Sequence, residues 1–155
     1  MHLTPATMAP KLKLLEEGLA KRSDGKTMDT FERTAMSHLI MTDHVKAAID
    51  MAKPQVALYV GGMGAQVKNF HNEAMVERGF AAEAARIQEL YLAGHKDEAI
   101  ATVPDEYIDD AALIGPEARL AERLVAWRDA GFTLMRLSVH TPDAMEVIAR
   151  IARKG

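Results

Sequence analysis

Apolar side chains recur at helical spacing along most of this chain. Leu12, Leu15 and Leu19 fall on one face of a helix. Thr4 and Pro5 precede them, and proline suits the first position of a helix because its missing N–H would have no intrahelical partner there. The same spacing, with glycines where helices end, predicts further helices. One covers residues 42–62 with a break at Pro54, and a shorter one ends at Arg78. The complete set is 5–21, 42–62, the piece ending at Arg78, 81–93, 96–102, 104–111, 115–131 and 141–155.

Two segments depart from this pattern and predict strands. The run from Phe132 to Val139 is rich in large apolar residues and has no helix-breaking residue, which is typical of a short buried strand. A second strand is predicted within residues 30–41, most strongly in its second half. Because the helix over 115–131 leads directly into the strand at Phe132, the two form half of a βαβ unit, whose strands are parallel. The pattern alone predicts a mainly α-helical chain with about two parallel strands.

Three stretches of the chain resemble a known superfamily. Residues 113–138 read LIGPEARLAERLVAWRDAGFTLMRLS and resemble the last helix and strand of the luciferase-like monooxygenases. Residues 57–80 and 84–109 read ALYVGGMGAQVKNFHNEAMVERGF and AARIQELYLAGHKDEAIATVPDEYID. Both resemble the C-terminal part of the deazaflavin (coenzyme F420)-dependent oxidoreductases of that superfamily. The resemblance covers nearly the whole chain from Pro5 onward.

The resemblance implies an α/β fold that is the C-terminal part of a TIM-type (β/α)₈ barrel. A complete barrel takes roughly 250 residues, whereas this chain has 155. Two strands cannot close a barrel, so residues 1–155 are interpreted as a single domain that forms its C-terminal portion. Members of the family carry most of their barrel strands, and much of the cofactor pocket, upstream of this region. The catalytic residues therefore stay unknown, and the chain is expected to be inactive without those strands.

The implied activity is hydride transfer between coenzyme F420 and a small organic substrate, with flavin mononucleotide (FMN) as the alternative cofactor because it serves other branches of the superfamily. The alternative function is a non-catalytic interaction domain that associates with itself. A third hypothesis is an autonomous cofactor-binding module. A homo-oligomer, or association with a missing N-terminal half, is expected because a pair of strands is barely stable by itself and a parallel sheet is normally covered on both faces.

The composition of the chain indicates which partners, covalent links and location are expected. The formal net charge is −3, which gives no basic field for a nucleic acid or an anionic membrane surface. The chain contains no cysteine, so disulfides and thiolate metal sites are excluded. No signal-peptide pattern and no apolar run of transmembrane length occurs. A cytoplasmic location is expected by default.

The final strand carries the first candidate site. If Met135 and its alternate neighbours face the outer helices, then Arg136, Ser138 and His140 share the lumenal side, because side chains alternate along a strand. Barrel enzymes place function at the C-terminal ends of strands. A lumenal arginine needs a partner, which is either a carboxylate from another strand or an anionic group of a ligand. His140 is either a substrate contact or a hydrogen-bonded loop residue.

A second candidate site follows the glycines at Gly61 to Gly64. Lys68 and Asn69 could hold the phosphate or carboxylate tail of a cofactor, with lysine acting as a point charge; the alternative is a solvated turn. The glycines themselves favour a tight turn between helices over a phosphate cradle, because no strand precedes them and no known phosphate-binding motif is spelled.

No metal site is predicted. The histidines are scattered along the chain, and no HExxH motif occurs. His38 and His44 are six positions apart.

Overall fold

The computed structural model describes residues 3–64, 68–141 and 143–153. Its contacts divide the chain into two compact units. Unit 1 contains Leu3–Asp43 and, in its described part, residues 111–153; unit 2 contains His44–Asp110. Each unit is described by itself below. The expectation of one domain over residues 1–155 stays a prediction.

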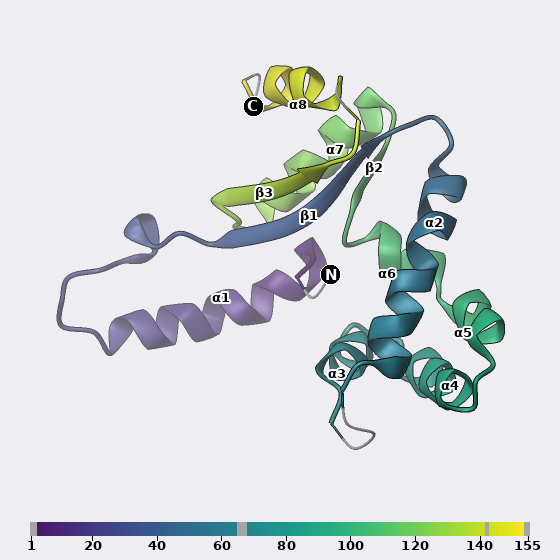
Figure 1. Cartoon of the computed structure of the whole chain (residues 1–155). Coiled ribbons are helices and arrows are strands. Elements are labelled where there is room, and N and C mark those ends of the chain that lie inside the picture. Colours follow the sequence, from purple (N-terminus) through teal and green to yellow (C-terminus); the bar gives the residue numbers. More distant parts are fainter. Residues whose placement is uncertain (1–2, 65–67, 142, 154–155) are drawn as a thin grey trace. The chain divides into compact units, whose positions relative to one another are not determined.

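Unit 1 is built on a parallel sheet of three strands in the order β2-β1-β3 (Figure 1). The strands are β1 (Thr34–Met41), β2 (Leu113–Gly115) and β3 (Leu134–Val139). Both β2 and β3 pair with β1, so each of them keeps one edge unpaired within the sheet. The sequence predicted about two strands and missed β2. Its three residues are fully buried, but a run this short shows no alternation and lies directly before a strong helix signal.

The first strand also begins later than the predicted start at residue 30. Met28–Thr30 forms a short 3₁₀ turn, η1, and Arg33 then fixes the entry to the strand. Its backbone N–H donates to the Thr133 hydroxyl at 2.9 Å. Its guanidinium donates to the carbonyls of Gly131 and Met28, both at 2.6 Å. The bonds to Thr133 and Gly131 join segments about 100 positions apart, and no local sequence pattern contains them.

Three helices pack on one face of this sheet: α1 (Pro5–Ala20), α7 (Glu117–Asp129) and α8 (Ala144–Ala152). The buried cluster between helices and sheet has contributions from every one of these elements, and the Trp127 and Phe132 rings lie 5.1 Å apart in it. The buried residues of this cluster are Met8, Ala35, Leu39, Leu113, Leu120, Trp127, Phe132 and Ala144. Burial of these apolar surfaces is the main stabilising term of unit 1.

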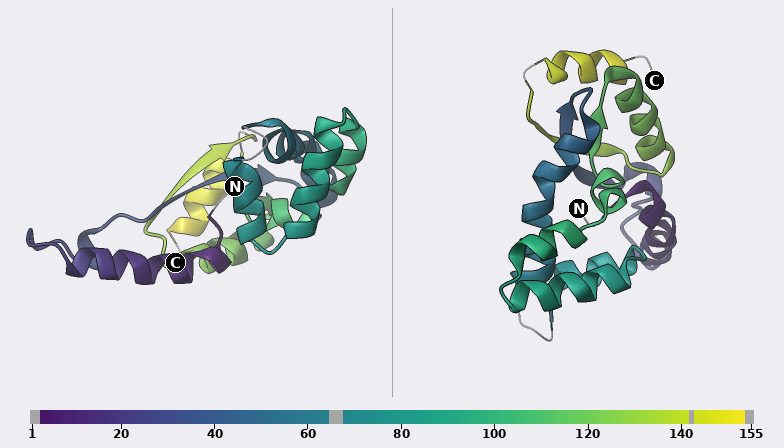
Figure 2. Two further views of the ribbon diagram at one scale, coloured as in Figure 1. Left: turned by 90° about the horizontal axis from the view of Figure 1, so that it is seen from below. Right: turned by 90° about the vertical axis from the view of Figure 1, so that its right-hand side faces the viewer.

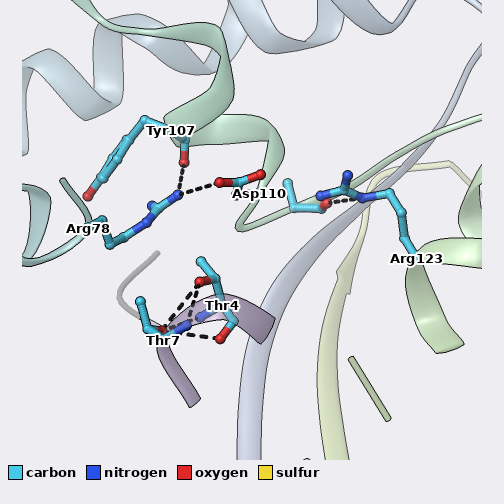
Figure 3. Close-up of polar contacts among 7 residues, drawn as sticks. Thr4, Thr7, Arg78, Tyr107, Asp110 and Arg123 are labelled. Carbon is cyan, nitrogen blue, oxygen red and sulfur yellow. Dashed lines mark hydrogen bonds and ion pairs between the residues drawn. The ribbon is translucent and has the colours of Figure 1, made fainter. Parts of the chain in front are cut away.

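The predicted start of α1 and the predicted end of α7 are confirmed. The last helix begins at Ala144, later than the predicted start at Thr141, and Pro142 and the predicted end beyond residue 153 lie outside the described residues. Thr4 caps α1 in a reciprocal pair, because the Thr7 N–H donates to the Thr4 hydroxyl at 3.3 Å and the Thr4 N–H donates to the Thr7 hydroxyl at 2.9 Å (Figure 3). Helix α7 ends before Gly131, whose φ of +94° is the left-handed conformation that glycine adopts without strain.

The helices of unit 2, in its described part, are joined by short irregular segments. Its elements are α2 (Val45–Ala57), the π-helical turn η2 (Leu58–Gly62), α3 (Phe70–Glu77), α4 (Ala81–Leu92), α5 (Lys96–Thr102) and α6 (Asp105–Asp109). Figure 2 shows these helices from two further sides. Their buried apolar residues include Ile49, Val56, Val60, Met75, Ile87, Leu90, Val103, Tyr107 and Ile108.

The sequence predicted that Pro54 kinks or divides this helix, and the predicted division is wrong. Helix α2 contains Pro54 and continues to Ala57, where the backbone widens into η2. The glycines at the end of η2 serve packing, because a Cβ on Gly61 or on Gly62 would lie 2.5 Å from the Tyr91 side chain of α4. A tight turn was predicted at these glycines, but Gly61 and Gly62 lie within η2, where they allow Tyr91 of α4 to approach the backbone closely.

A buried arginine connects the end of α3 to α6 (Figure 3). The Arg78 side chain is 3% exposed, and its guanidinium donates to the Tyr107 carbonyl at 2.8 Å. The same guanidinium lies 4.0 Å from the centre of the Tyr107 ring and 3.8 Å from the Asp110 carboxylate. Burial lowers the pKa of Arg78. The contacts with Tyr107 and Asp110 offset part of the free-energy cost of burying the charged guanidinium.

Candidate functional site

The face of the sheet opposite α1, α7 and α8 carries the polar side chains of β3. Met135, Leu137 and Val139 pack against the helix-covered core, whereas Arg136 and Ser138 are exposed. The alternation predicted for this strand is therefore confirmed. Within unit 1, no described helix packs on this second face, which is called the open face below.

Strand β1 adds residues to the same face through its register with β3. Met36 pairs with Arg136, and His38 pairs with Ser138. Because paired residues of neighbouring parallel strands point to the same side of a sheet, Met36 and His38 stand beside the polar side chains of β3. The open face therefore presents a short row of polar groups near the carboxyl ends of two adjacent strands.

The closest contact in this row joins two histidines. The Nδ1 atom of His38 lies 3.0 Å from the Nε2 atom of His140, and the rings are tilted by 31° with centroids 5.2 Å apart. One of the two nitrogens must carry the proton that the other accepts. The backbone N–H of His140 donates to the Leu39 carbonyl at 3.2 Å, so the end of β3 is fixed to β1 at this point.

Burial lowers the pKa of His38, and the neighbouring charge of His140 lowers it further. Both effects oppose a second proton on the pair, because one ring loses water and two imidazolium groups repel each other at this distance. His38 is thus held neutral to a lower pH than an ordinary histidine.

Arg136 is exposed on the open face, and none of the described residues places a carboxylate within ion-pair distance of it. Of the two predicted partners, a carboxylate from another strand is not found within the described part of this chain. The guanidinium remains available to an anion from outside, for which its planar set of donors is well suited.

The second candidate site lies in unit 2 and is organised differently. Asn69 is 5% exposed and caps α3: its side-chain oxygen accepts from the N–H groups of His71 and Asn72 at 2.9 and 3.2 Å. Its amide donates to the carbonyls of Tyr59 and Val60 at 3.1 and 2.8 Å. All four hydrogen-bonding positions of this amide are used by the backbone. Lys68, by contrast, is exposed.

The structure thus brings together three of the five predicted residues, Arg136, Ser138 and His140, and places Lys68 and Asn69 in the other unit. The sequence missed His38, which lies 102 positions from His140 and becomes its neighbour only through the pairing of β1 with β3. A cofactor role for any of these residues stays a prediction.

Two further observations concern metal ions and membranes. No group of three or more histidine, aspartate or glutamate side chains suited to a metal ion occurs in the described ranges. None of the helices formed by those residues is long and apolar enough to cross a membrane.

Comparison with known proteins adds the following. The family model for luciferase-like monooxygenases matches residues 1–134. A protein of Mycobacterium tuberculosis whose name assigns it to the coenzyme F420-dependent oxidoreductases is 32% identical over 137 residues, which is 88% of this chain and 40% of that protein. The solved structure of the coenzyme F420-dependent tetrahydromethanopterin reductase from Methanopyrus kandleri matches 94% of this chain with a TM-score of 0.62 at 21% identity. The chain covers 40% of that structure too, so it spans less than half the length of either protein.

Proposed function

Because this chain belongs to the luciferase-like monooxygenase family, we propose that it forms the C-terminal part of a coenzyme F420-dependent oxidoreductase. The reaction would be hydride transfer between the deazaflavin and a small organic substrate. The names of the two similar proteins support this cofactor. The mainly helical chain with its three-stranded parallel sheet is consistent with part of an α/β barrel, which is the architecture that the family uses.

The observation that carries the proposal is the polar row on the open face. Arg136, Ser138 and His140 lie toward the carboxyl end of β3, where barrel enzymes bind their ligands. A guanidinium, a hydroxyl and an imidazole can each donate a hydrogen bond, and no carboxylate among the described residues neutralises the arginine. The row fits a ligand that carries phosphate or carboxylate groups, as coenzyme F420 does.

In this proposal the residues of the chain hold the ligand. Arg136 binds an anionic group, with Ser138 donating a further hydrogen bond. His140, fixed to β1 through its backbone N–H, orients a polar group of the cofactor or substrate at the edge of the sheet. The bound deazaflavin supplies the centre that accepts or donates the hydride.

The chain is proposed to be inactive by itself. Its sheet has three strands, which cannot enclose a cofactor, and the matched length is 40% of each similar protein. The remaining barrel strands must come from another part of the same polypeptide or from a separate chain.

Titration with coenzyme F420 tests this. The purified chain is titrated while deazaflavin fluorescence is followed, alone and with the part of the mycobacterial relative that this chain does not match. We expect saturable binding only with the complementing part, and loss of it in the Arg136→Met variant. Parallel titration with FMN distinguishes the two cofactors. Absence of binding to either cofactor in both arrangements would refute the proposal.

A second candidate function, self-association without catalysis, is favoured by apolar surface in unit 1. Met36 and Leu134 on β1 and β3 are 63% and 48% exposed, and β3 has an unpaired edge, which is a surface that pairs readily with another strand. A cavity of about 380 Å³ between α7, α8 and β3 is lined largely by apolar side chains such as Leu124, Leu137 and Ile148. Light scattering decides this candidate: a stable dimer that binds no cofactor with the complementing part supports it, and a monomer excludes it.

A further inference from the structure

The hydrogen-bonded histidine pair on the open face brings together two groups that can each bind a metal ion. The ring nitrogens of His38 and His140 that face each other are 3.0 Å apart. The two side chains come from adjacent strands, and His140 is exposed while His38 is partly buried. Solvent therefore reaches the pair from the open side.

The separation of these nitrogens matches that of two ligands on one metal ion. Bonds between a divalent metal and an imidazole nitrogen are about 2.0–2.1 Å long, and two such bonds ending on atoms 3.0 Å apart enclose an angle of about 94°. This is close to the 90° between neighbouring positions of a square-planar or tetragonal ion, the arrangement preferred by Cu²⁺ and Ni²⁺. A tetrahedral Zn²⁺ site would need the nitrogens to be about 3.3 Å apart.

We propose that His38 and His140 chelate one Cu²⁺ or Ni²⁺ ion at the carboxyl end of the sheet. The ring that donates the hydrogen bond takes its other neutral tautomer by proton exchange with solvent, so that each ring keeps one N–H on its outer nitrogen. Both facing nitrogens, Nδ1 of His38 and Nε2 of His140, then bind the ion through their lone pairs. The other coordination positions face the open side and are filled by water, since the described residues offer no third histidine or carboxylate here.

The backbone favours this chelation because it already holds the two strands in register. His38 pairs with Ser138 in the parallel ladder, and Leu39 accepts the N–H of His140. Binding therefore orders two rings on a fixed frame and does not have to close a loop, which lowers its entropic cost. Arg136 is two residues before Ser138 on the same face, and its exposed charge is screened by solvent.

The proposed metal site and the proposed F420-dependent activity have different requirements. Metal binding uses this chain alone, without coenzyme F420 and without complementing strands. An ion bound between the rings would also occupy part of the open face, so it would compete with any ligand held by His140.

The test is metal titration of the full chain. All variants carry His2→Gln, which removes a histidine that lies outside the described residues. We expect one Cu²⁺ ion per chain, with an electron paramagnetic resonance spectrum that shows two equatorial imidazole nitrogens, and Ni²⁺ binding that is tighter than Zn²⁺ binding. His38→Gln and His140→Gln should each weaken Cu²⁺ binding by roughly 10- to 100-fold.

His95→Gln is the matched control, because His95 is exposed and its nearest recorded partner is the Glu98 carboxylate at 2.9 Å. It should leave Cu²⁺ affinity unchanged. Circular dichroism of each variant shows that the fold is retained. Equal affinities in the two site variants and the control, or a spectrum with a single nitrogen ligand, would overturn the proposal and leave the F420 proposal untouched.

Discussion

The buried polar side chains of unit 2 form hydrogen bonds with the backbone. The polar side chains on the open face of unit 1, by contrast, are exposed to solvent. Asn69 and Arg78 are almost fully buried, and each donates to carbonyls of neighbouring segments. Arg136 and Ser138 are exposed beside a histidine pair. An arginine or asparagine that satisfies the backbone is part of the fold, and one that presents unsatisfied donors at the end of a strand is a candidate for binding. Substitutions in the two regions should therefore separate stability from binding.

Arg78→Met should have the largest effect on stability. The substitution leaves the Tyr107 carbonyl without its donor and removes a guanidinium that stacks on the Tyr107 ring. We expect a loss of about 2–4 kcal/mol in the free energy of unfolding, measured by urea denaturation followed with circular dichroism. Arg86→Met is the control, because Arg86 is 50% exposed and pairs only with Glu89 among recorded ion pairs; it should cost less than about 0.5 kcal/mol. Equal losses in the two variants would show that Arg78 is not structural.

Asn69→Ala should come next, with a loss of about 2 kcal/mol. The variant loses the cap of α3 and the two bonds that hold the carbonyls of Tyr59 and Val60. Asn69→Ser retains an acceptor for the cap and loses only the amide donors, so it should be destabilised less. Urea midpoints of the three proteins measure this order. If Asn69→Ala were as stable as the parent but failed to bind F420 with the complementing part, Asn69 would be a binding residue after all.

Acid should weaken unit 2 through Asp105. The Lys53 ammonium, 2.5 Å from its carboxylate, and Lys46 hold the pKa of Asp105 below its ordinary value. In the unfolded chain this carboxyl takes up its proton at a higher pH, so its contribution to stability is complete above the unfolded pKa of about 3.9 and is lost as the pH falls through the folded value. The urea midpoint is measured between about pH 6 and pH 3, the range in which carboxyl groups titrate. It should fall less steeply with decreasing pH in the Asp105→Asn variant than in the parent. Asp43→Asn, at an exposed position, should follow the parent.

The sequence predicted the helices of both units well because capping residues, glycines and apolar spacing are local signals. From alternation alone, the sequence predicted which side chains of β3 point toward the helices. By the same alternation, the sequence predicted that Arg136, Ser138 and His140 lie on the opposite face. It missed β2, whose three residues are defined only by pairing with β1, and His38, whose partner lies far along the chain. Asn69 was predicted to hold a cofactor tail or to lie in a solvated turn, whereas the structure buries it as a helix cap. Two of its four backbone hydrogen bonds go to carbonyls of η2, and no local sequence pattern contains them.

Arg136→Met should have the smallest effect on stability and the clearest effect on binding. Arg136 is exposed and has no recorded partner among the described residues, so its removal should change the free energy of unfolding by less than about 0.5 kcal/mol. A charged hydrogen bond to an anionic ligand contributes about 1.5–3 kcal/mol, so F420 affinity with the complementing part should fall by roughly 10- to 150-fold. Arg22→Met, which removes an exposed arginine paired with Asp24 on the same unit, should change neither quantity. Loss of folding in Arg136→Met, with unchanged affinity in the molecules that still fold, would place this arginine with Arg78 and remove the contrast between the two units.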